Sequence, residues 1–146
     1  MNDRLVEQVR GDLVLSTDRA RLDVDRVLAW LLASHWGATM TRPILERAIE
    51  NSVAVGVYRG DAQLGFLRAV SDLATYAYLT DVIVDDAARG QGIGSWMVEA
   101  ILAHPDLQGL RRWALWSRDA PWLYRKFGFS TDMPPSTYME LRPGRR

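Results

Sequence analysis

The chain has 146 residues, of which 48% are hydrophobic and 25% charged, a composition that favours a soluble globular protein with one domain over residues 1–146. Its 18 basic and 18 acidic residues give a formal net charge of zero, so the charge balance does not indicate binding to nucleic acid or to a membrane surface. The absence of cysteine excludes disulfides, thiolate metal sites and a cysteine nucleophile, and with only two histidines we expect no metal site.

The N-terminal segment is charged and has no apolar stretch of the kind found in a signal peptide, and the longest apolar runs, such as VLAWLLA, are too short to span a bilayer. We therefore expect a cytoplasmic protein. The first eleven residues are expected to be loosely ordered, and a short strand follows at 13–15. Residues 23–34 predict a helix with Asp23 as its N-cap, because apolar side chains recur there at spacings of three and four.

A loop at 35–41 leads into a second short helix at 44–49, with Pro43 at its first position. Three β-strands are predicted next, and a helix, a strand, a short helix and a final strand follow. Their ranges are 53–58, 64–70, 76–84, 92–103, 113–116, 121–127 and 138–141. The strand–helix–strand unit implies a parallel pair, whereas the hairpin turn at 59–61 implies an antiparallel pair, so the sheet is predicted to be mixed.

The clearest motif is a glycine-rich turn between a β-branched strand and an amphipathic helix, Arg89-Gly90-Gln91-Gly92-Ile93-Gly94. Unpaired N–H groups at a helix start, together with the helix dipole, form a site for an anion. Glycines let a phosphate approach the backbone, and Arg89 adds a positive charge. The alternative is a tight turn that needs glycine only for its backbone angles. The nucleotide-binding pattern GxxxxGK[ST] is absent, and the dinucleotide fingerprint GxGxxG is not matched.

This run resembles the R/Q-x-x-G-x-G/A signature of the GCN5-related N-acetyltransferases (GNAT family). A second segment, Leu123–Phe129 (LYRKFGF), resembles that family's L-Y-x-K-x-G-F segment, and the separation of the two motifs is also typical. The resemblance covers the whole chain by element order and is specific over residues 79–129. It implies an α/β (α+β) fold of GNAT type, a mixed and mostly antiparallel twisted sheet flanked by helices, in which the parallel strands four and five splay apart.

The resemblance also implies acetyl-coenzyme A as cosubstrate. In that family, backbone N–H groups of the signature bind the pyrophosphate and the strand before the loop pairs with the pantetheine arm. Ser117 stands where many relatives carry an asparagine that contacts the cofactor, and its side chain is shorter. The implied cofactor-binding residues are Ile83, Val84, Arg89, Gly90, Gln91, Gly92, Ile93, Gly94, Ser95 and Ser117.

Two catalytic residues are predicted, Tyr124 and Asp81. Tyr124 matches the family's tyrosine that protonates the departing thiolate; the alternative is a tyrosine packed in the core. Asp81 is a carboxylate in the apolar strand LTDVIV and is the candidate for taking the proton from the acceptor ammonium. The alternatives to a catalytic role for Asp81 are a salt bridge to Arg68 and a solvated carboxylate at a strand end. Asp85 is expected to be a solvated loop residue.

The acceptor is expected to be a small-molecule primary amine, with weak candidates for its binding in His35, Trp36 and Arg42. Each has a structural alternative. His35 can cap a helix end, Trp36 can pack over the hydrophobic core, and Arg42 can be an exposed helix residue without a binding role. The predicted reaction is direct acetyl transfer without a covalent enzyme intermediate. The rival function is a non-catalytic acyl-CoA-binding sensor or partner module, which would need neither Tyr124 nor Asp81. No nucleic-acid or membrane partner is expected, and a homodimer is left open.

Overall fold

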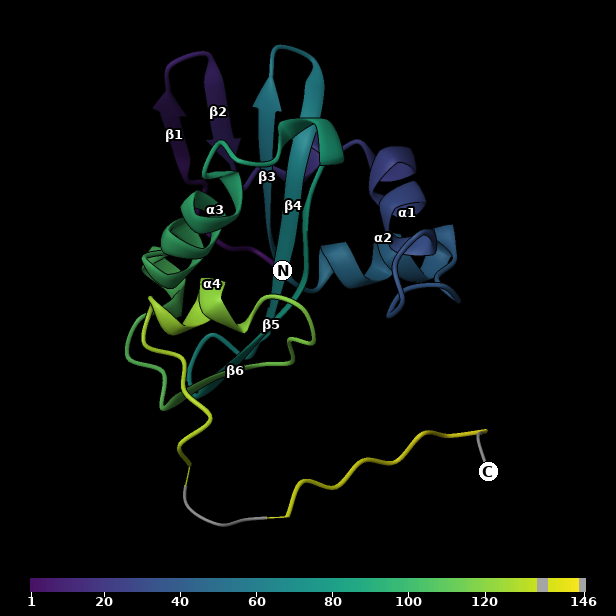
Figure 1. Cartoon of the computed structure of the whole chain (residues 1–146), viewed down its shortest axis with the longest axis vertical. Coiled ribbons are helices and arrows are strands. Elements are labelled where there is room, and N and C mark those ends of the chain that lie inside the picture. Colours follow the sequence, from purple (N-terminus) through teal and green to yellow (C-terminus); the bar gives the residue numbers. More distant parts are fainter. Residues whose placement is uncertain (134–136, 145–146) are drawn as a thin grey trace.

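One six-stranded sheet forms the centre of the protein, whose computed structural model describes residues 1–133 and 137–144. The strands lie side by side in chain order (Figure 1). They are β1 (Glu7–Arg10), β2 (Leu13–Ser16), β3 (Val53–Arg59), β4 (Ala62–Ser71), β5 (Tyr76–Val84) and β6 (Arg112–Leu115). Neighbouring strands are antiparallel except for β5 and β6, which are parallel. The predicted mixed, mostly antiparallel sheet is thereby confirmed.

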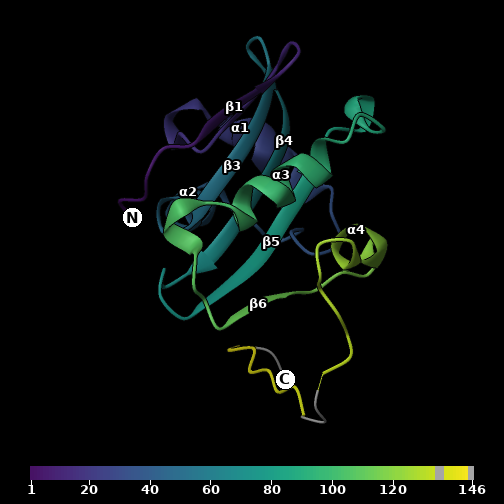
Figure 2. The same cartoon turned by 90° about the vertical axis from the view of Figure 1, so that its left-hand side faces the viewer.

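Helices cover both faces of this sheet (Figure 2). One face carries α1 (Val24–Leu32) and α2 (Arg42–Glu50), and the other carries α3 (Ile93–Leu102) and α4 (Pro121–Arg125). The described residues also form three short 3₁₀ turns: η1 (Arg19–Arg21), η2 (Asp86–Ala88) and η3 (Pro105–Leu107). Asp23 caps α1 as predicted, because its side chain accepts a hydrogen bond of 3.0 Å from the Arg26 N–H.

The strands have two hydrophobic faces because alternate side chains of a strand point to opposite sides of the sheet. Val53, Val55 and Val57 of β3 lie in the larger core cluster beneath α3. Ala54 of the same strand and Phe66 of β4 lie in the second cluster, where they pack with the buried side of α1 and α2, made of Val27, Leu31, Leu45 and Ile49.

The parallel strands β5 and β6 separate partway along β5. They correspond to the fourth and fifth strands predicted from the sequence, for which this separation was expected. β6 pairs with β5 only from Tyr76 to Leu79, while β5 continues to Val84. Beyond this point β5 also bulges, because Phe66 pairs with Ile83 but Arg68 pairs with Thr80, which leaves two residues of β5 opposite one of β4. Asp81 is one of the two, and its φ of 54° is a left-handed conformation, which is uncommon for a residue other than glycine.

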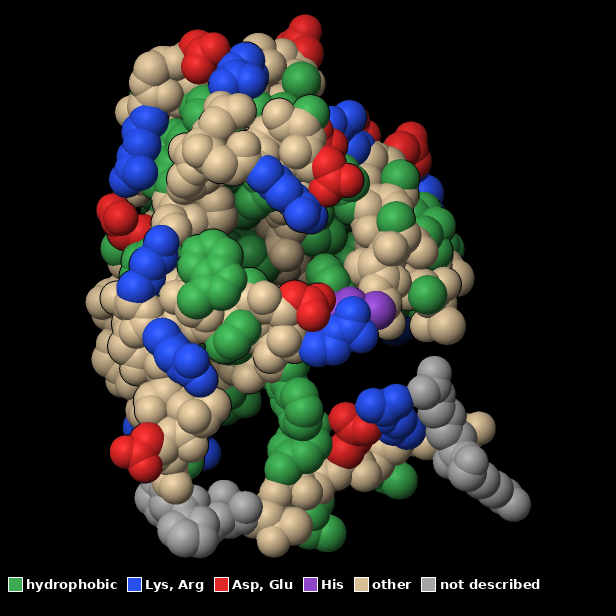
Figure 3. All heavy atoms as spheres, in the orientation of Figure 1, with side chains coloured by type: hydrophobic (Ala, Val, Ile, Leu, Met, Phe, Trp, Pro, Cys, Tyr) green, Lys and Arg blue, Asp and Glu red, His purple; other side chains and the backbone are tan. Residues whose placement is uncertain are grey.

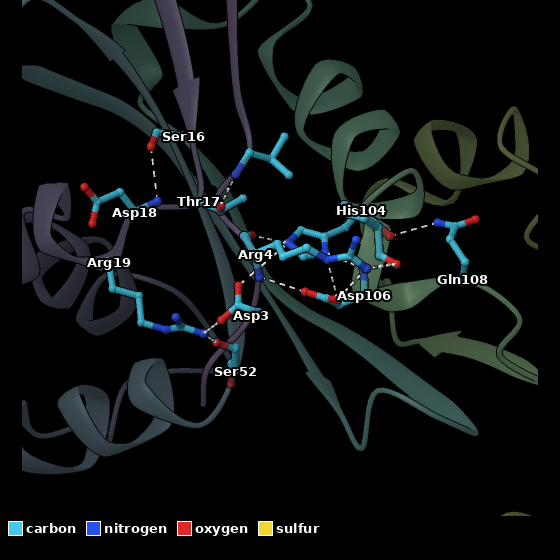
Figure 4. A network of polar contacts seen from close by, with 12 residues as sticks. Asp3, Arg4, Ser16, Thr17, Asp18, Arg19, Ser52, His104, Asp106 and Gln108 are labelled. Atoms are coloured by element: carbon cyan, nitrogen blue, oxygen red, sulfur yellow. Dashed lines mark hydrogen bonds and ion pairs between the residues drawn. The ribbon is translucent and has the colours of Figure 1, made fainter.

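The N-terminal segment is more ordered than we expected from the sequence. β1 pairs with β2 from Glu7 to Arg10, although only one of its four residues is apolar. The preceding residues are held by polar contacts (Figure 4): Asp3 is buried against Arg19 at 2.5 Å, and the Arg4 backbone N–H donates to Asp106 at 2.7 Å. Hydrogen bonds and ion pairs therefore order this segment in place of apolar burial, and the expectation of loose order is wrong.

The predicted final strand at 138–141 is also wrong. Residues 137–142 have no strand pairing in the described parts of the chain, and this segment extends away from the sheet (Figure 1). Alternating hydrophobicity identifies a segment able to pair, but a strand forms only where another strand lies beside it.

Candidate active site

The glycine-rich turn leads from η2 into the first turn of α3. Gly92 is the N-cap of α3, and Gly90 and Gly92 have φ angles of 80° and 77°, a backbone conformation that glycine adopts without strain. A Cβ atom at either position would meet nothing within 4 Å, so backbone conformation rather than crowding explains these glycines. Within the described residues, the N–H groups of residues 91–95 donate no hydrogen bond, whereas the next one, of Trp96, bonds to the Gly92 carbonyl at 3.0 Å. The turn therefore presents a set of unpaired donors at a helix N-terminus, which suits an anion.

Positive side chains surround this turn. Arg89 is exposed and pairs with Asp86 at 3.0 Å, and Arg59 of β3 donates to Gln91 at 2.9 Å. Lys126, which follows α4, contacts the hydroxyl of Ser95 in the first turn of α3. The sequence interpretation missed Arg59 and Lys126, since both are distant in sequence and only the fold brings them to the turn.

Asp85 fixes the entrance to the turn. Its side chain accepts hydrogen bonds from the Ala87 N–H at 3.3 Å and the Trp30 indole N–H at 3.4 Å, and it pairs with Arg26 at 3.2 Å. The interpretation of Asp85 as a solvated loop residue is wrong, because 22% of its side chain is exposed and helix α1 is attached to the turn through it.

The two sequence motifs meet at the start of α3. A Cβ atom added to Gly94 would lie 3.7 Å from both the Leu123 side chain of α4 and the Val84 side chain of β5. The edge of β5 that carries Ile83 and Val84 has no strand partner on the β6 side among the described residues. The geometry therefore places an unpaired strand edge next to the unpaired N–H groups, an arrangement that fits an extended ligand with amides at one end and phosphates at the other.

Tyr124 is held in α4 with its ring largely buried. Its ring meets Phe129 edge-on at 6.1 Å, and burial raises the pKa of its hydroxyl above the ordinary tyrosine value. It lines a groove of about 790 Å³ beside β6, together with Leu115 and Ser117. A phenol in this setting stays protonated at neutral pH and can donate a proton. Ser117 serves at least a structural purpose, because its hydroxyl accepts a hydrogen bond of 3.1 Å from the Ala120 N–H ahead of α4.

Asp81 lies at the β5 bulge and is 5% exposed. One carboxylate oxygen accepts a hydrogen bond from Arg68 Nε at 2.6 Å, and the other accepts one from the Trp36 indole N–H at 3.0 Å. The salt bridge to Arg68, one of the alternatives from the sequence, is therefore present. Trp36 comes from the loop between α1 and α2, so the structure brings this predicted acceptor residue to Asp81.

The other two acceptor candidates do not approach Asp81. His35 is exposed and contacts the ring of Trp36 edge-on at 5.0 Å. Arg42 pairs with Asp25 and, at 2.7 Å, with Glu46. The sequence analysis missed Tyr78. Burial raises the pKa of Tyr78, and electrostatic interactions with neighbouring groups, Asp81 among them, raise this pKa further. Tyr78 lines a pocket of about 300 Å³ with Trp116, Tyr138, Glu140 and Arg142.

Residues 1–133 and 137–144 contain no group of three or more His, Cys, Asp or Glu side chains that could hold a metal ion. None of the helices formed by these residues is both long enough and apolar enough to cross a membrane.

Comparison with known proteins identifies the family. Residues 50–131 match the family model of the acetyltransferase (GNAT) domain. A Gibberella zeae protein assigned as an acetyltransferase is 31% identical over 140 residues, which cover 80% of this chain and 78% of the relative. The crystal structure of a Xanthomonas campestris protein assigned to the GNAT family superposes with a TM-score of 0.84 at 36% identity, covering 93% of this chain and 97% of that one.

A more distant structure, of a Clostridium acetobutylicum protein described as an acetyltransferase with acetyl-CoA, has a TM-score of 0.60 at 14% identity, covering 82% of this chain and 90% of that one. It shares the fold. The match over more than half of the chain, the relative at 31% identity and the motif geometry agree. The chain belongs to the GNAT family of acetyltransferases, which use acetyl-CoA as acetyl donor.

Proposed function

We propose that this acetyltransferase moves the acetyl group of acetyl-CoA directly to the primary amine of a small molecule in the cytoplasm. The observation that carries the proposal is the run of unpaired N–H groups at residues 91–95, next to the unpaired edge of β5 and close to the second motif. Acetyl-CoA supplies an activated thioester, and the residues of this chain bind it, orient the acceptor and move two protons.

The N–H groups of the turn take the pyrophosphate, with Arg89, Arg59 and Lys126 adding positive charge around them. The backbone of Ile83 and Val84 takes the amides of the pantetheine arm. Ser117 stays a weaker candidate for cofactor contact, since its hydroxyl already caps the chain before α4.

Asp81 takes the proton of the acceptor ammonium, directly or through a water, and the amine then attacks the thioester carbonyl. One carboxylate oxygen of Asp81 accepts hydrogen bonds from Trp36 and, at 3.5 Å, from the Thr80 hydroxyl, whereas the other accepts one from Arg68 and can accept a second. The pair with Arg68 therefore fixes the carboxylate at the bulge without using all of its lone pairs. Tyr124 gives its proton to the thiolate that leaves, and the second proton, which the nitrogen loses as it becomes an amide, returns to Tyr124.

The acceptor is proposed to be a small molecule because the pocket lined by Tyr78, whose hydroxyl is influenced by the charge of Asp81, is small. It measures about 300 Å³ and has three aromatic walls, Tyr78, Trp116 and Tyr138. A compact amine with an apolar or aromatic part fits such walls. Of the predicted acceptor residues, Trp36 is retained in this role because it contacts Asp81.

A thiol-release assay tests the proposal. Purified protein is incubated with acetyl-CoA and a panel of small aromatic and aliphatic amines, amino acids and lysine peptides, with matched acids and alcohols as controls. Thiol release that depends on a small amine supports the proposal, and release with peptides alone refutes the substrate class. Tight CoA binding without thiol release for any acceptor would instead favour the rival function, an acyl-CoA sensor.

A further inference from the structure

Asp3 is a buried charged residue that the proposed reaction does not use. Figure 3 shows acidic and basic side chains spread over the surface of the protein, which is their ordinary place. The side chain of Asp3, in contrast, is only 1% exposed, and it pairs with Arg19 at 2.5 Å (Figure 4). Burying an ion pair costs free energy of solvation, whereas a pair in solvent costs little. Ordering the N-terminal segment alone does not require a pair at this depth.

Arg19 holds the turn that connects α2 to β3. Its Nε donates to the Ile49 carbonyl at 2.9 Å, and its Nη2 donates to the Ser52 carbonyl as well as to Asp3. Ile49 lies in the last turn of α2, and Ser52 comes directly before β3. One guanidinium, backed by the Asp3 carboxylate, therefore fixes Ser52 relative to the helix.

The side chain of Ser52 continues these contacts toward the candidate active site. Ser52 is 2% exposed, and its hydroxyl donates its single proton to the Ala48 carbonyl at 2.7 Å. The oxygen is left to accept, and Arg68 Nη1 donates to it at 3.3 Å. The Nε of the same guanidinium donates to Asp81 at 2.6 Å. Arg68 is therefore held between two acceptors, one in the turn before β3 and one in the bulge of β5.

The register of the sheet explains why these residues meet. Arg68 lies opposite Ala54 of β3 on one side and opposite Thr80 of β5 on the other. Ser52 precedes Ala54 by two residues, so its side chain is on the same face of the sheet, the one covered by α1 and α2. We call the connected residues the polar chain: Asp3, Arg19, Ser52, Arg68 and Asp81.

Asp81 is a residue whose position needs support. Its φ of 54° is a strained conformation for aspartate, and such strain persists only where the surroundings hold the residue in place. A group that acts on a substrate must also stay within about 0.5 Å of its productive position. Arg68 supports the carboxylate, but its own long side chain has many rotamers, and a second contact is needed to select one. Ser52 provides that contact.

We propose that Ser52 and the Asp3–Arg19 pair are positioning residues for acetyl transfer. They hold the Arg68 guanidinium, and Arg68 holds the Asp81 carboxylate where the acceptor ammonium gives up its proton. This role rests on the proposed function, in which Asp81 is the base. A polar chain that only stabilised the fold would lower the melting temperature when broken, but it would leave the kcat of the folded protein unchanged.

Ser52→Ala tests the link to Arg68, with rates measured on the small amine that gives the fastest thiol release. The change removes the acceptor of Arg68 Nη1 and should lower kcat by about 3–10-fold, the loss that corresponds to one hydrogen bond, at unchanged KM for acetyl-CoA. Ser71→Ala is the matched control, because the Ser71 hydroxyl also donates to a carbonyl at 2.7 Å, that of Tyr76, and accepts one hydrogen bond, from the Leu73 N–H. The control should lose a similar amount of thermal stability and keep its kcat. A folded Ser52→Ala protein with full kcat, or an equal loss of kcat in the control, would overturn the proposal.

A double-mutant cycle separates this positioning role from the role of Asp81 itself. Asp81→Asn alone reports on the proposed function: a normal kcat in this variant, or no thiol release with any amine, refutes the proposed function and the positioning role with it. If Asp81→Asn lowers kcat, Ser52→Ala should cause no further loss in that background, because no base is left to position. An equal fold-loss in both backgrounds would leave Asp81 as the base and refute the positioning role.

Asp3→Asn tests the far end of the polar chain. The change keeps the shape of the side chain and removes the charge that backs Arg19, so kcat should fall by about 2–5-fold at unchanged KM for acetyl-CoA. Asp106→Asn is the control, because Asp106 accepts a hydrogen bond from the Arg4 N–H at 2.7 Å and so holds the same segment through a residue outside the polar chain. This variant should keep its kcat. Full activity in Asp3→Asn, or an equal loss in Asp106→Asn, would remove Asp3 and Arg19 from the positioning role.

Discussion

The Arg68 guanidinium and the Asp81 carboxylate meet at 2.6 Å across β4 and β5, in a part of the sheet that is nearly closed to solvent. The bulge of β5 sets this relationship, because it places Asp81 on the same side as Trp36, whose indole binds the second carboxylate oxygen. A buried carboxylate with one paired cation has two possible purposes. It either stabilises the fold or holds a substrate proton, and these two purposes respond differently to pH.

Asp81→Asn tests the catalytic purpose. The change keeps the size of the side chain and removes its charge, so turnover should fall by roughly 10²–10⁴-fold at neutral pH, where the acceptor amine is mostly protonated. Raising the pH should partly restore the rate, because more acceptor arrives neutral. The measurement is rate against pH for both proteins at saturating acetyl-CoA.

Arg68→Gln is the control for this pair. It removes the partner and leaves Asp81 buried without its cation, so it should lower stability strongly, by about 3–5 kcal/mol, without producing the pH-dependent rescue. If Asp81→Asn loses stability in the same way and turns over normally, Asp81 is only a structural residue.

Gly92→Val should abolish binding of CoA while the protein remains folded. The φ of 77° at this position is unfavourable for a branched residue, and the new side chain would stand over the N–H groups of the turn. The strain costs about 1–3 kcal/mol. Gly60→Val provides a matched control, since Gly60 also has positive φ, 57°, with nothing within 4 Å of its Cβ position. Both variants should be destabilised similarly in thermal unfolding, but only the first should lose affinity in calorimetric titration with CoA.

Tyr124→Phe should lower the rate of acetyl transfer and leave the KM for acetyl-CoA nearly unchanged. The ring keeps its contact with Phe129, and only the proton donor is lost, which corresponds to roughly 10²–10⁴-fold in kcat. Because burial raises the pKa of Tyr124, the hydroxyl stays protonated up to at least its ordinary pKa of about 10. The ratio of the two rates should therefore be constant from neutral pH to about pH 9. A variant with full activity would show that Tyr124 is a packing residue.

Much of the fold was predictable because the elements around the site have strong local signals. The cap at Asp23, the alternating valines of β3 and the glycines at 90 and 92 each identify an element or a turn without tertiary information. Strand β1 has one apolar residue in four and forms through its backbone pairing with β2, which no short window of sequence reveals. The strand predicted at 138–141 has the right alternation but no neighbouring strand in the described residues.

The site was predictable where a motif carries it and not where distant elements meet. The turn at residues 89–94 and Tyr124 come from motifs in consecutive residues. The contacts of Lys126 with Ser95 and of Asp85 with Arg26 join residues that are 31 and 59 positions apart, and only the packing of α4 and α1 brings them together. The same holds for Trp36, which the sequence proposes as an acceptor residue but which the fold joins to Asp81.

Lys126→Ala should weaken CoA binding by roughly tenfold or more, the usual loss for a hydrogen bond to a charged group. Its ammonium lies at the first turn of α3 against Ser95, where it can pair with a phosphate. The loss should shrink at high ionic strength because salt screens the phosphate–ammonium attraction. Arg47→Ala is the control, since Arg47 is exposed on α2 and its loss changes the net charge equally. Equal weakening by both variants would mean that only the overall charge matters, and no weakening by Lys126→Ala would exclude this contact.

Tyr58→Phe should stabilise the protein, contrary to the usual effect of a core substitution. Tyr58 is 3% exposed, and its hydroxyl has no hydrogen-bond partner among the described residues. Such an unpaired polar group costs about 1–3 kcal/mol, which the phenylalanine avoids. The ring would keep its place over Gly56 and its contact with the guanidinium of Arg21, 4.5 Å from the ring centroid.

The same substitution should change the response to alkali. Burial raises the pKa of Tyr58 to about 12 in the folded protein, against about 10 when unfolded, so the unfolded chain loses this proton first as pH rises. Tyr58 therefore lowers the free energy of unfolding progressively between about pH 10 and pH 12, and Tyr58→Phe should remove that part of the decline. Denaturant unfolding at neutral pH and near pH 11 measures both effects. Tyr76→Phe is the control, because Tyr76 is 39% exposed and is therefore not a buried tyrosine. A Tyr58→Phe protein that is less stable at neutral pH would show that this hydroxyl is bonded in solution.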